Sequence, residues 1–481
     1  MVLPLVAEVA LVARVLEVHP ANPRWLTSDG GDSALVLTGA HTWSLFQDYD
    51  FNPPFKANRY LEGLRKSGHN FTRGWFWEDG YYSPLPYVRD RGEYRLSPPY
   101  NKRYLNRLRK RIRAAQRREL FVSVMLFQGW SMDDRSGLRD PGPWPENPYN
   151  RDNTSEAVSK QQAALHIGNA QEQQLEYVSF FARKLCSRRN IVWEIVNEAH
   201  PNSLGTANAS NWQQNILERL RLECGRHLTW VSCPDQGGLT RTEKSRQTEI
   251  MMGMDSDLVT PCRPDARFVE NPEVADGRKV IVADTDHFRP DELTPEWVWR
   301  AFLRGQHPIF MDLTKRLTWW NGEPWDRGEN RWKQMHRALG AVQELVGVVN
   351  TTSGNVPASG LAQMAPQAKA GSQPGDQKRP ADSEWALFSS DKPCPARKKG
   401  KGRCSQARAN GDEFLVYAGP NETVRVCRLK AHGEYRHRWK KTVRPGFMTP
   451  SGTSTANTKG CLKLKNPGEK FAILHLERMM G

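Results

Sequence analysis

The sequence of 481 residues alternates short apolar runs with longer amphipathic segments over most of its length. The runs resemble buried strands in length and composition, and the segments between them have the spacing of helices that pack one face on a core. We expect strands at 34–38, 70–75, 120–127, 191–196, 228–232, 257–260, 279–283 and 308–311. We expect helices at 60–67, 104–118, 171–187, 212–224, 295–304 and 332–346. Eight strands alternating with helices over about 320 residues predict a (β/α)8 TIM barrel.

An open, doubly wound sheet is the alternative fold for such an alternation. That fold needs a glycine-rich phosphate loop or a dinucleotide fingerprint after an early strand. The sequence has no GxGxxG motif at such a position. The barrel is therefore the expected fold class.

The last part of the chain has a different composition. Residues 349–383 are rich in Gly, Pro, Ser, Gln and Ala, which is typical of a low-complexity linker. Short alternating runs bounded by turn residues follow, and they predict a small antiparallel β-sandwich. These runs lie at 385–388, 413–418, 423–429, 435–440, 461–465 and 471–476. We expect a barrel domain at 20–348, a linker at 349–383 and a basic β-sandwich domain at 384–481.

The formal net charge of +16 is concentrated at one end of the chain. Residues 378–481 carry 22 basic and 9 acidic side chains, which leaves a net charge of only +3 for residues 1–377. The nearly neutral barrel suits a neutral or mildly charged ligand. The basic tail, with its basic loop at 396–408, suggests at most contact with an acidic polysaccharide or surface. The sequence has no helix-turn-helix, zinc-finger or RNA-binding motif, so nucleic acid is not an expected partner.

The cysteines and the N-terminus indicate in which cellular compartment the protein is expected. The eight cysteines are scattered without a CxxC pair, so we expect mostly isolated thiols rather than a zinc ribbon or a dense disulfide frame. No segment has roughly 18 uninterrupted apolar residues, so no membrane span is expected. The apolar N-terminus is interrupted by charged residues and makes a poor signal peptide. A secreted or periplasmic location is expected only if this end is a truncated or misassigned signal, and a cytoplasmic one otherwise.

Polar and aromatic side chains cluster where the predicted strands end. In a barrel the loops after the strands form the mouth, so reactive groups are expected there. Indole faces stack on sugar C–H groups, while carboxylates and amides bind hydroxyl groups. The candidate substrate-binding residues are His41, Trp43, Arg73, Trp75, Trp77, Trp130, Asn197, His200, Asp286, His287 and Asp312. This composition predicts a carbohydrate site for an oligo- or polysaccharide.

Two carboxyl groups are the strongest candidates for catalysis. Glycoside hydrolysis needs one protonated carboxyl group to assist the leaving group and one carboxylate to attack or to activate water. Glu198 follows an apolar strand, where desolvation favours the protonated form, so we expect it to be the acid/base. Asp284 ends another strand, and Arg73 can keep it ionised as the nucleophile or base. Asp286 and Asp312 compete with Asp284 for this role.

A metal site is the alternative use of these ligands. Asp284, Asp286, His287, His200 and His41 could together bind a metal that activates water. The sequence has neither HExxH nor a paired HxH element, so we expect no metal and no cofactor.

Several segments resemble known carbohydrate-active enzymes. Residues 191–200, IVWEIVNEAH, resemble the strand-four signature of the retaining (β/α)8 glycoside hydrolases of clan A. The segments at 37–43, 69–73, 123–130, 284–287 and 304–312 look like a group of bacterial glycosidase-like barrels with a C-terminal β-domain labelled as collagen-binding. The resemblance covers roughly residues 33–348 and, more loosely, 385–478.

The resemblance implies roles for individual residues. It makes Glu198 the acid/base, Asn197 a contact to a sugar 2-hydroxyl group, and Arg73 the partner of the nucleophile. The clan usually has Glu where Asp284 stands, and the shorter side chain leaves both retaining and inverting outcomes open. The expected function is hydrolysis of O-glycosidic bonds. A non-catalytic carbohydrate- or matrix-binding barrel, or a polyanion binder acting through residues 384–481, are the alternatives.

Overall fold

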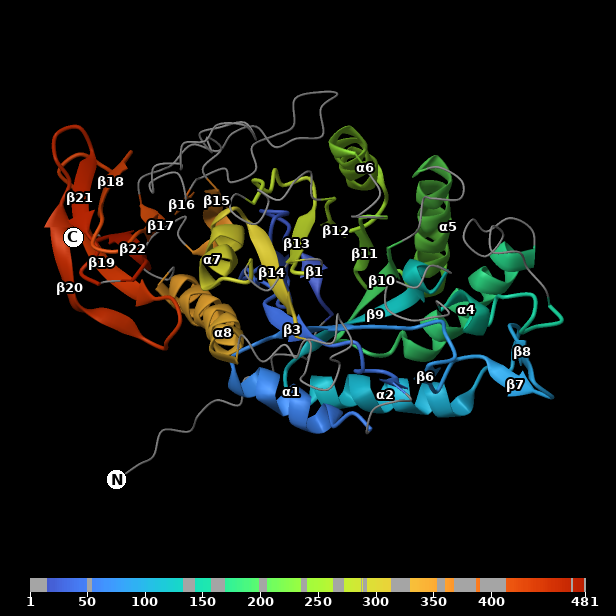
Figure 1. Ribbon diagram of the computed structural model, residues 1–481. Helices are drawn as coiled ribbons and strands as arrows, with labels where there is room; N and C mark the ends of the chain where they lie inside the picture. The colour runs from blue at the N-terminus through green and yellow to red at the C-terminus, as the bar shows by residue number, and fades with distance from the viewer. Residues whose placement is uncertain are drawn as a thin grey trace.

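The computed structural model contains a barrel of parallel strands wrapped by helices and an antiparallel β region at the C-terminal end (Figure 1). It describes residues 15–49, 54–132, 143–156, 169–198, 206–234, 240–262, 272–286, 288, 292–312, 329–352, 360–366, 386–389, 412–468 and 470–479. The candidate residues His200 and His287 and the basic loop at 396–408 lie outside these described residues.

Eight parallel strands close into a barrel in the order in which they occur along the chain. They are β3 (Gly39–His41), β5 (Phe71–Gly74), β9 (Phe121–Gln128), β10 (Ile191–Asn197), β11 (Thr229–Ser232), β12 (Leu258–Thr260), β13 (Val280–Asp284) and β14 (Gln306–Met311). The helices around them are α1 (Ala57–Lys66), α2 (Lys102–Gln116), α4 (Asn169–Leu185), α5 (Thr206–Cys224), α6 (Arg241–Gly253), α7 (Pro295–Leu303) and α8 (Glu329–Thr352). The predicted TIM barrel is confirmed. In the described part of the chain, no helix has the length and apolar character that a membrane span requires.

The barrel interior is closed at one end by apolar side chains. Most of these come from the beginnings of the barrel strands, and Leu16 and Leu26 come from the N-terminal hairpin of β1 (Glu17–Val18) and β2 (Leu26–Thr27). The strand residues in this cluster are Phe71, Phe121, Val192, Trp230, Leu258, Val280, Val282 and Ile309. A packed floor of this kind leaves only the opposite end, where the strands terminate, for a functional site.

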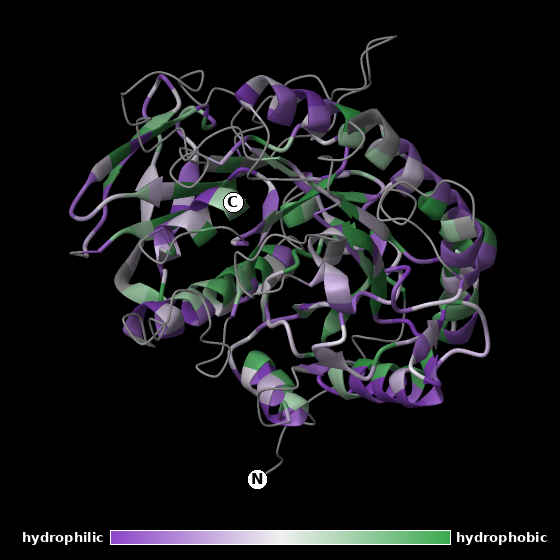
Figure 2. Cartoon of the chain, turned by 45° about the vertical axis from the view of Figure 1, so that its right-hand side comes forward, coloured by the Kyte–Doolittle hydropathy of each residue, from purple (hydrophilic) through white to green (hydrophobic). Residues whose placement is uncertain are grey.

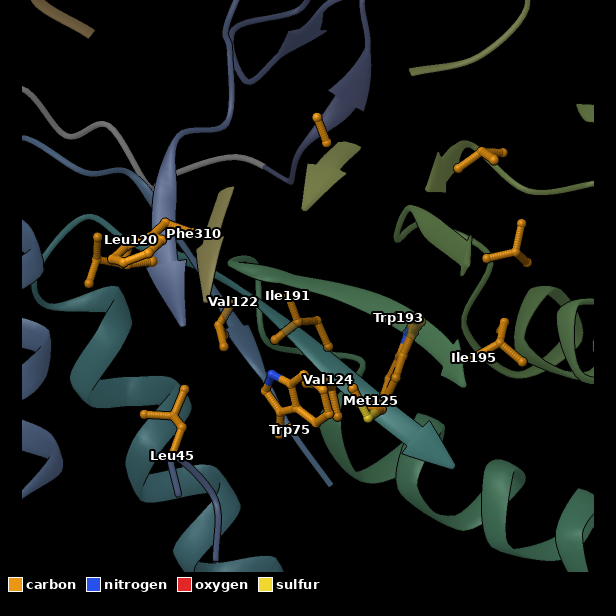
Figure 3. Packing of buried hydrophobic residues seen from close by; sticks show 14 of the residues in the cluster. Leu45, Trp75, Leu120, Val122, Val124, Met125, Ile191, Trp193, Ile195 and Phe310 are labelled. Atoms are coloured by element: carbon orange, nitrogen blue, oxygen red, sulfur yellow. The ribbon is translucent and has the colours of Figure 1, made fainter. Parts of the chain in front are cut away.

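A second and larger core lies between the strands and the helices. In Figure 2 the central strands are mostly hydrophobic, whereas the helices combine hydrophobic and hydrophilic residues. Trp193 and Ile195 of β10 belong to this core, as do Val122 and Val124 of β9 (Figure 3). Such burial on both faces explains why the strands read as nearly continuous apolar runs in the sequence.

The first barrel strand lies later in the chain than the sequence predicts. The apolar run at 34–38 precedes β3, and Leu35 forms an isolated antiparallel bridge with Leu26 of the hairpin. Strand β3 contains Gly39, where a Cβ atom would lie 1.8 Å from the carbonyl oxygen of Phe71. The close approach of β3 to β5 therefore requires glycine, a residue that strand propensity disfavours.

Helix α6 and strand β20 are among the elements that were not expected. Helix α6 has few apolar residues, but it begins with a capping box in which the Thr240 side chain accepts a hydrogen bond from the Glu243 amide. Strand β20 (Phe447–Thr455) contains Pro, Gly, Ser and Thr and lacks the alternation of a half-buried strand. Pairing with β19 (Glu434–Lys441) provides its hydrogen bonds instead.

The C-terminal region is an antiparallel β-sandwich. Its larger sheet has the order β15-β16-β17-β22-β19-β20, and β18 pairs with β21 in a separate ribbon. The remaining strands are β15 (Met364–Pro366), β16 (Ala386–Ser389), β17 (Glu413–Ala418), β18 (Thr423–Cys427), β21 (Cys461–Lys465) and β22 (Ala472–Arg478). Apolar side chains from both sheets, including Val424 of the ribbon and Leu474 of the larger sheet, form one core.

The segment 349–383 contains ordered elements as well. Helix α8 continues to Thr352, and β15 lies within the segment and pairs with β16. The barrel and the sandwich are in direct contact: Trp299 Nε1 of α7 donates to the Thr442 carbonyl oxygen, and buried Lys440 lies 3.0 Å from Glu344 of α8.

The expectation of isolated thiols is wrong for six of the eight cysteines. The disulfides are Cys186–Cys224, Cys233–Cys262 and Cys427–Cys461. The partners are 38, 29 and 34 residues apart in sequence, so no short spacing motif reveals them. Cys394 and Cys404 lie outside the described residues.

Candidate active site

The candidate site consists of polar side chains directly above the apolar floor of the barrel. Side chains two residues apart on a strand lie on the same face. Arg73 follows Phe71 in this way, Glu194 follows Val192, and Asp284 follows Val282. In each pair the first residue belongs to the floor cluster. Three strands that are distant in sequence therefore bring one cation and two carboxylates together inside the barrel.

Arg73 is the centre of this site. Its side chain is 2% exposed, and its Nη1 donates to Asp284 Oδ2 at 2.9 Å while its Nε donates to Glu194 Oε1 at 2.8 Å. Its Nη2 donates to Asn197 Oδ1 at 2.8 Å. Burial alone would lower the pKa of Arg73, but the carboxylates of Glu194 and Asp284 outweigh it and raise this pKa. The guanidinium group therefore stays charged and orients three acceptors.

Aromatic rings line the guanidinium group as well. The Arg73 Cζ atom lies 4.6 Å from the ring centre of Trp75 and 5.2 Å from that of Trp230. Such cation–π contacts stabilise a desolvated cation and hold the plane of the guanidinium group. The position of Arg73 is thus determined by hydrogen bonds at its rim and by rings at its faces.

Among the described residues, three donors form hydrogen bonds with Asp284. Besides Arg73, these are His41 Nε2 at 2.9 Å and the backbone amide of Asp286 at 3.1 Å, both to Oδ1. Trp75 Nε1 lies 2.7 Å from His41 Nδ1, and because an indole nitrogen can only donate, His41 Nδ1 must accept. The His41 proton therefore lies on Nε2, facing Asp284. Both carboxylate oxygens of Asp284 thus accept hydrogen bonds, and Trp75 holds the His41 ring in the orientation that contacts Asp284.

Glu198 lies where the chain leaves β10. It follows Asn197, the last residue of the strand, and its φ of 49° places it in the left-handed region, which is uncommon for a non-glycine residue. Backbone strain of this kind is concentrated at functional sites. Asn197 is buried and held from both sides, since its Nδ2 donates to Gln128 Oε1 at 3.1 Å and its Oδ1 accepts from Arg73.

Sequence reasoning missed Glu194 and Ser123. Glu194 is fully buried, and Ser123 Oγ donates to its Oε2 at 2.9 Å. Burial raises the pKa of Glu194, although Arg73 acts in the opposite direction. The signal was present in the sequence, because a Glu within the apolar strand at 191–196 faces the interior in register with Val192 and needs a buried cation as partner.

Glu78 is a second buried carboxyl group near the site. Its Oε2 accepts from the backbone amide of Gln128 at 3.1 Å, and its Oε1 has no hydrogen-bond partner among the described residues. Burial raises the pKa of Glu78 to about 8. Through Gln128 it is linked to Asn197 and so to Arg73.

The four candidate tryptophans form one aromatic cluster. Trp43, Trp75 and Trp77 are 6%, 2% and 3% exposed, and the planes of Trp75 and Trp77 are stacked with ring centres 5.5 Å apart. Trp77 makes an edge contact with Trp130 at 5.4 Å. Trp130 is half-buried, so it offers more surface to a ligand than the other three.

The remaining candidates lie in different surroundings. Asp286 is near the cluster, with its Oδ2 3.8 Å from Arg73 Nη1, and it is 17% exposed. Asp312 is not brought to Arg73: its Oδ2 lies 3.1 Å from His336 Nε2 of α8. Among the described residues, the group of potential metal ligands close enough to one another is Cys186, Cys224 and His227, and both of its cysteines are in a disulfide.

The fold is similar to that of solved glycoside hydrolase structures. A structure titled glycoside hydrolase aligns with a TM-score of 0.56 at 12% identity, covering 96% of this chain and 97% of the other. A glycoside hydrolase family 5 structure from Bacteroides vulgatus ATCC 8482 aligns with a TM-score of 0.58 at 11% identity, covering 96% and 93%. At such low identity these likenesses show the shared fold. No protein-family model matches the sequence, and no curated protein matches it either.

Proposed function

We propose that this chain hydrolyses O-glycosidic bonds of an oligo- or polysaccharide, with Glu198 as the acid/base and Asp284 as the second carboxylate. The observation that carries the proposal is the fixed Asp284 carboxylate at the end of β13, which accepts hydrogen bonds from Arg73 and His41. Glu198 follows the end of β10 on the same rim of the barrel. The shared fold with structures titled glycoside hydrolase agrees with this chemistry.

The two carboxyl groups have complementary surroundings. Asp284 accepts hydrogen bonds from Arg73, His41 and the Asp286 amide, which suits a carboxylate that attacks an anomeric carbon or activates water. Glu198 has a strained backbone conformation and follows an apolar strand. In our assignment its carboxyl group donates the proton to the departing oxygen. Asp286 is more exposed than Asp284, and its backbone amide donates to Asp284, so we assign it to substrate binding rather than to attack.

Other side chains position the reacting groups and bind the sugar. The Asn197 amide has two N–H bonds, of which Gln128 accepts one, and the other suits a substrate hydroxyl group. Trp130 is the candidate for stacking on a sugar ring, because it is the least buried of the four tryptophans. His41 and Arg73 contact Asp284 rather than the sugar and act as positioning residues.

The first test is a screen of the purified protein on plant and bacterial polysaccharides, with identification of released sugars. We expect release by the parent protein and a loss of at least about a hundredfold in Asp284→Asn, because a positioned carboxylate contributes on this scale. Asp286→Asn should retain more turnover than Asp284→Asn, and Asp32→Asn, at an exposed position away from the site, serves as the matched control and should keep the turnover of the parent. If Asp284→Asn hydrolyses as well as the parent, the assignment of Asp284 is wrong. If the parent binds a polysaccharide but releases no sugar from any, the chain is a non-catalytic binding protein.

A further inference from the structure

Helix α2 has an unusual charge for a segment of the nearly neutral barrel. Its 15 residues include two Lys and five Arg and no acidic residue. Like charges one turn apart repel and destabilise a helix, and cations in the first turn oppose the helix dipole. Residues 1–377 thus have a low net charge as a whole but a high local density of positive charge on α2.

Part of this charge gathers in what we call the basic cluster, made of Arg109, Arg113, Lys184 and Arg188. Arg109 and Arg113 are one turn apart on α2, and Arg109 Nη2 donates to the Lys184 carbonyl oxygen at the end of α4. Arg188 lies in the loop between α4 and β10. Two residues after Arg188, Asn190 Nδ2 donates to the Ile112 carbonyl oxygen of α2 at 3.2 Å, so this loop lies against the end of α2 that carries Arg113. After burial, the charges of Arg113 and Arg109 lower the pKa of Arg188, as expected for guanidinium groups that are near one another.

Within the described part of the chain, the basic cluster has no acidic partner. No described carboxylate forms a salt bridge with Arg109, Arg113 or Arg188. The Nε atoms of Arg109 and Arg188 are buried and have no hydrogen-bond partner among the described residues. Other cations of the barrel are compensated: Arg107 pairs with Asp48, and Arg118 pairs with Glu62. Unpaired, converging guanidinium groups are suited to oxyanions, which they bind in a bidentate manner.

The location separates this cluster from the candidate active site. Helix α2 ends at Gln116 and β9 begins at Phe121, while Arg188 lies three residues before β10 begins at Ile191. The cluster therefore lies near the beginnings of β9 and β10, whereas Asn197 and Glu198 lie at the end of β10. A ligand on the basic cluster leaves the mouth of the barrel open.

We propose that the basic cluster is a second binding site that docks the protein on an acidic polysaccharide through its carboxylate or sulfate groups. The choice of a polysaccharide rests on the proposed function and on the three described disulfides. One of these disulfides joins Cys186 to Cys224, and Cys186 lies two residues before Arg188. Disulfides persist in oxidising compartments outside the cytosol. There, the anionic lipids of the cytoplasmic leaflet are not accessible, and a chain that acts on carbohydrates meets the carboxylate or sulfate groups of acidic polysaccharides. Docking raises the effective concentration of the substrate at the mouth.

The test measures binding of the full-length protein to polygalacturonate, neutral galactomannan and double-stranded DNA at several salt concentrations. The triple variant Arg109→Gln/Arg113→Gln/Arg188→Gln removes the cluster. Its matched control, Arg425→Gln/Lys463→Gln/Lys465→Gln, removes three exposed cations from the β18–β21 ribbon. We expect salt-sensitive binding of polygalacturonate by the parent and a Kd about tenfold or more higher in the cluster variant, since each exposed ion pair contributes a factor of a few. The ribbon variant should change the Kd by less than about threefold.

Three results would overturn the docking site: no binding of polygalacturonate by the parent, equal binding by parent and cluster variant, or tighter binding of DNA than of polygalacturonate. A thermal midpoint of the cluster variant at or above that of the parent confirms that its fold is intact, since removal of like charges from α2 relieves repulsion. Asp284→Asn separates this proposal from the proposed function, because it should bind polygalacturonate like the parent. If that variant keeps both its binding and its hydrolysis, the assignment of Asp284 fails while the docking site stands.

Discussion

Arg73 Nη1 lies 2.9 Å from Asp284 Oδ2, and both side chains are almost completely buried, at 2% and 3% exposed. The same guanidinium group is hydrogen-bonded to Glu194. One cation thus compensates two buried carboxylates, and each of the three groups depends on the others for its charge state.

Replacing Arg73 with Met should be strongly destabilising, because it leaves Glu194 and Asp284 buried without a cation. We expect a loss of about 3–5 kcal/mol in the free energy of unfolding, measured by urea denaturation. Arg73→Lys keeps the charge but cannot contact Glu194, Asp284 and Asn197 with one planar group. We therefore expect it to be less destabilised than Arg73→Met but still to have a lower kcat/KM than the parent. Arg59→Met, at an exposed position of α1, is the control and should change stability by less than about 0.5 kcal/mol. A wild-type-like Arg73→Met protein would contradict this description of the site.

Glu78 should make stability decrease as the pH rises. Burial raises its pKa to about 8, so between pH 4.5 and 8 the folded chain holds a proton that the unfolded chain has lost. The contribution of Glu78 is complete below pH 4.5 and is lost by about pH 8. At pH 8 the free energy of unfolding of Glu78→Gln, measured by urea denaturation, should therefore exceed that of the parent by roughly 2–5 kcal/mol. At pH 5 the difference between the two free energies should be smaller. A difference that does not depend on pH would show that Glu78 is ionised in the folded protein.

The agreement between sequence and structure is best where the pattern is local. Each apolar run predicts a buried strand, and seven of the eight expected strands overlap the observed barrel strands β5 to β14. The expected strand at 34–38 is wrong because β3 is formed by Gly39–His41, in which Gly39 and Ala40 have low strand propensity. Gly39 is needed there for the close approach of β3 to β5. The pairing of Arg73 with Asp284 was expected, because each lies near the end of a predicted strand and the strand ends meet at the mouth of the barrel.

The features that were missed depend on contacts between distant parts of the chain. In the sequence, Glu194 is a charged residue within an apolar strand, and its partners are not evident from the pattern. The register of β10 with β9 and the closure of the barrel place it against Ser123 and Arg73. The disulfides join cysteines at least 29 residues apart, so their pairing follows from the tertiary fold. Asp312 ends a barrel strand like Asp284 but is held by His336 of α8, a contact that strand position alone does not indicate.

The Cys186–Cys224 disulfide should contribute to stability. It closes a loop of 38 residues, for which loss of chain entropy in the unfolded state corresponds to about 4 kcal/mol. The double variant Cys186→Ser/Cys224→Ser should unfold at lower urea than the parent. Reduction of the parent protein breaks the other described disulfides as well, so it should decrease stability by more than the double variant does. Stability that is insensitive to both treatments would argue against this disulfide.

Trp130 and Trp77 should respond differently to substitution by Ala. Trp130 is half-buried, so its loss should raise KM several-fold with little change in stability, because stacking on a sugar is removed. Trp77 is 3% exposed, so its loss should cost about 3–5 kcal/mol of stability. Steady-state kinetics and urea denaturation of both variants separate the two roles. An unchanged KM in Trp130→Ala would remove this residue from the substrate site.

The role of Glu198 as a proton donor is the central claim, and the leaving-group dependence of Glu198→Gln tests it most directly. The measurement compares kcat/KM of parent and variant on an activated aryl glycoside and on a glycoside with a poor leaving group, using Glu218→Gln on the exposed face of α5 as control. We predict a loss of about 10²–10⁴ on the poor leaving group and a much smaller loss on the activated one, since only the former needs protonation. Equal losses on both substrates would contradict the assignment of Glu198.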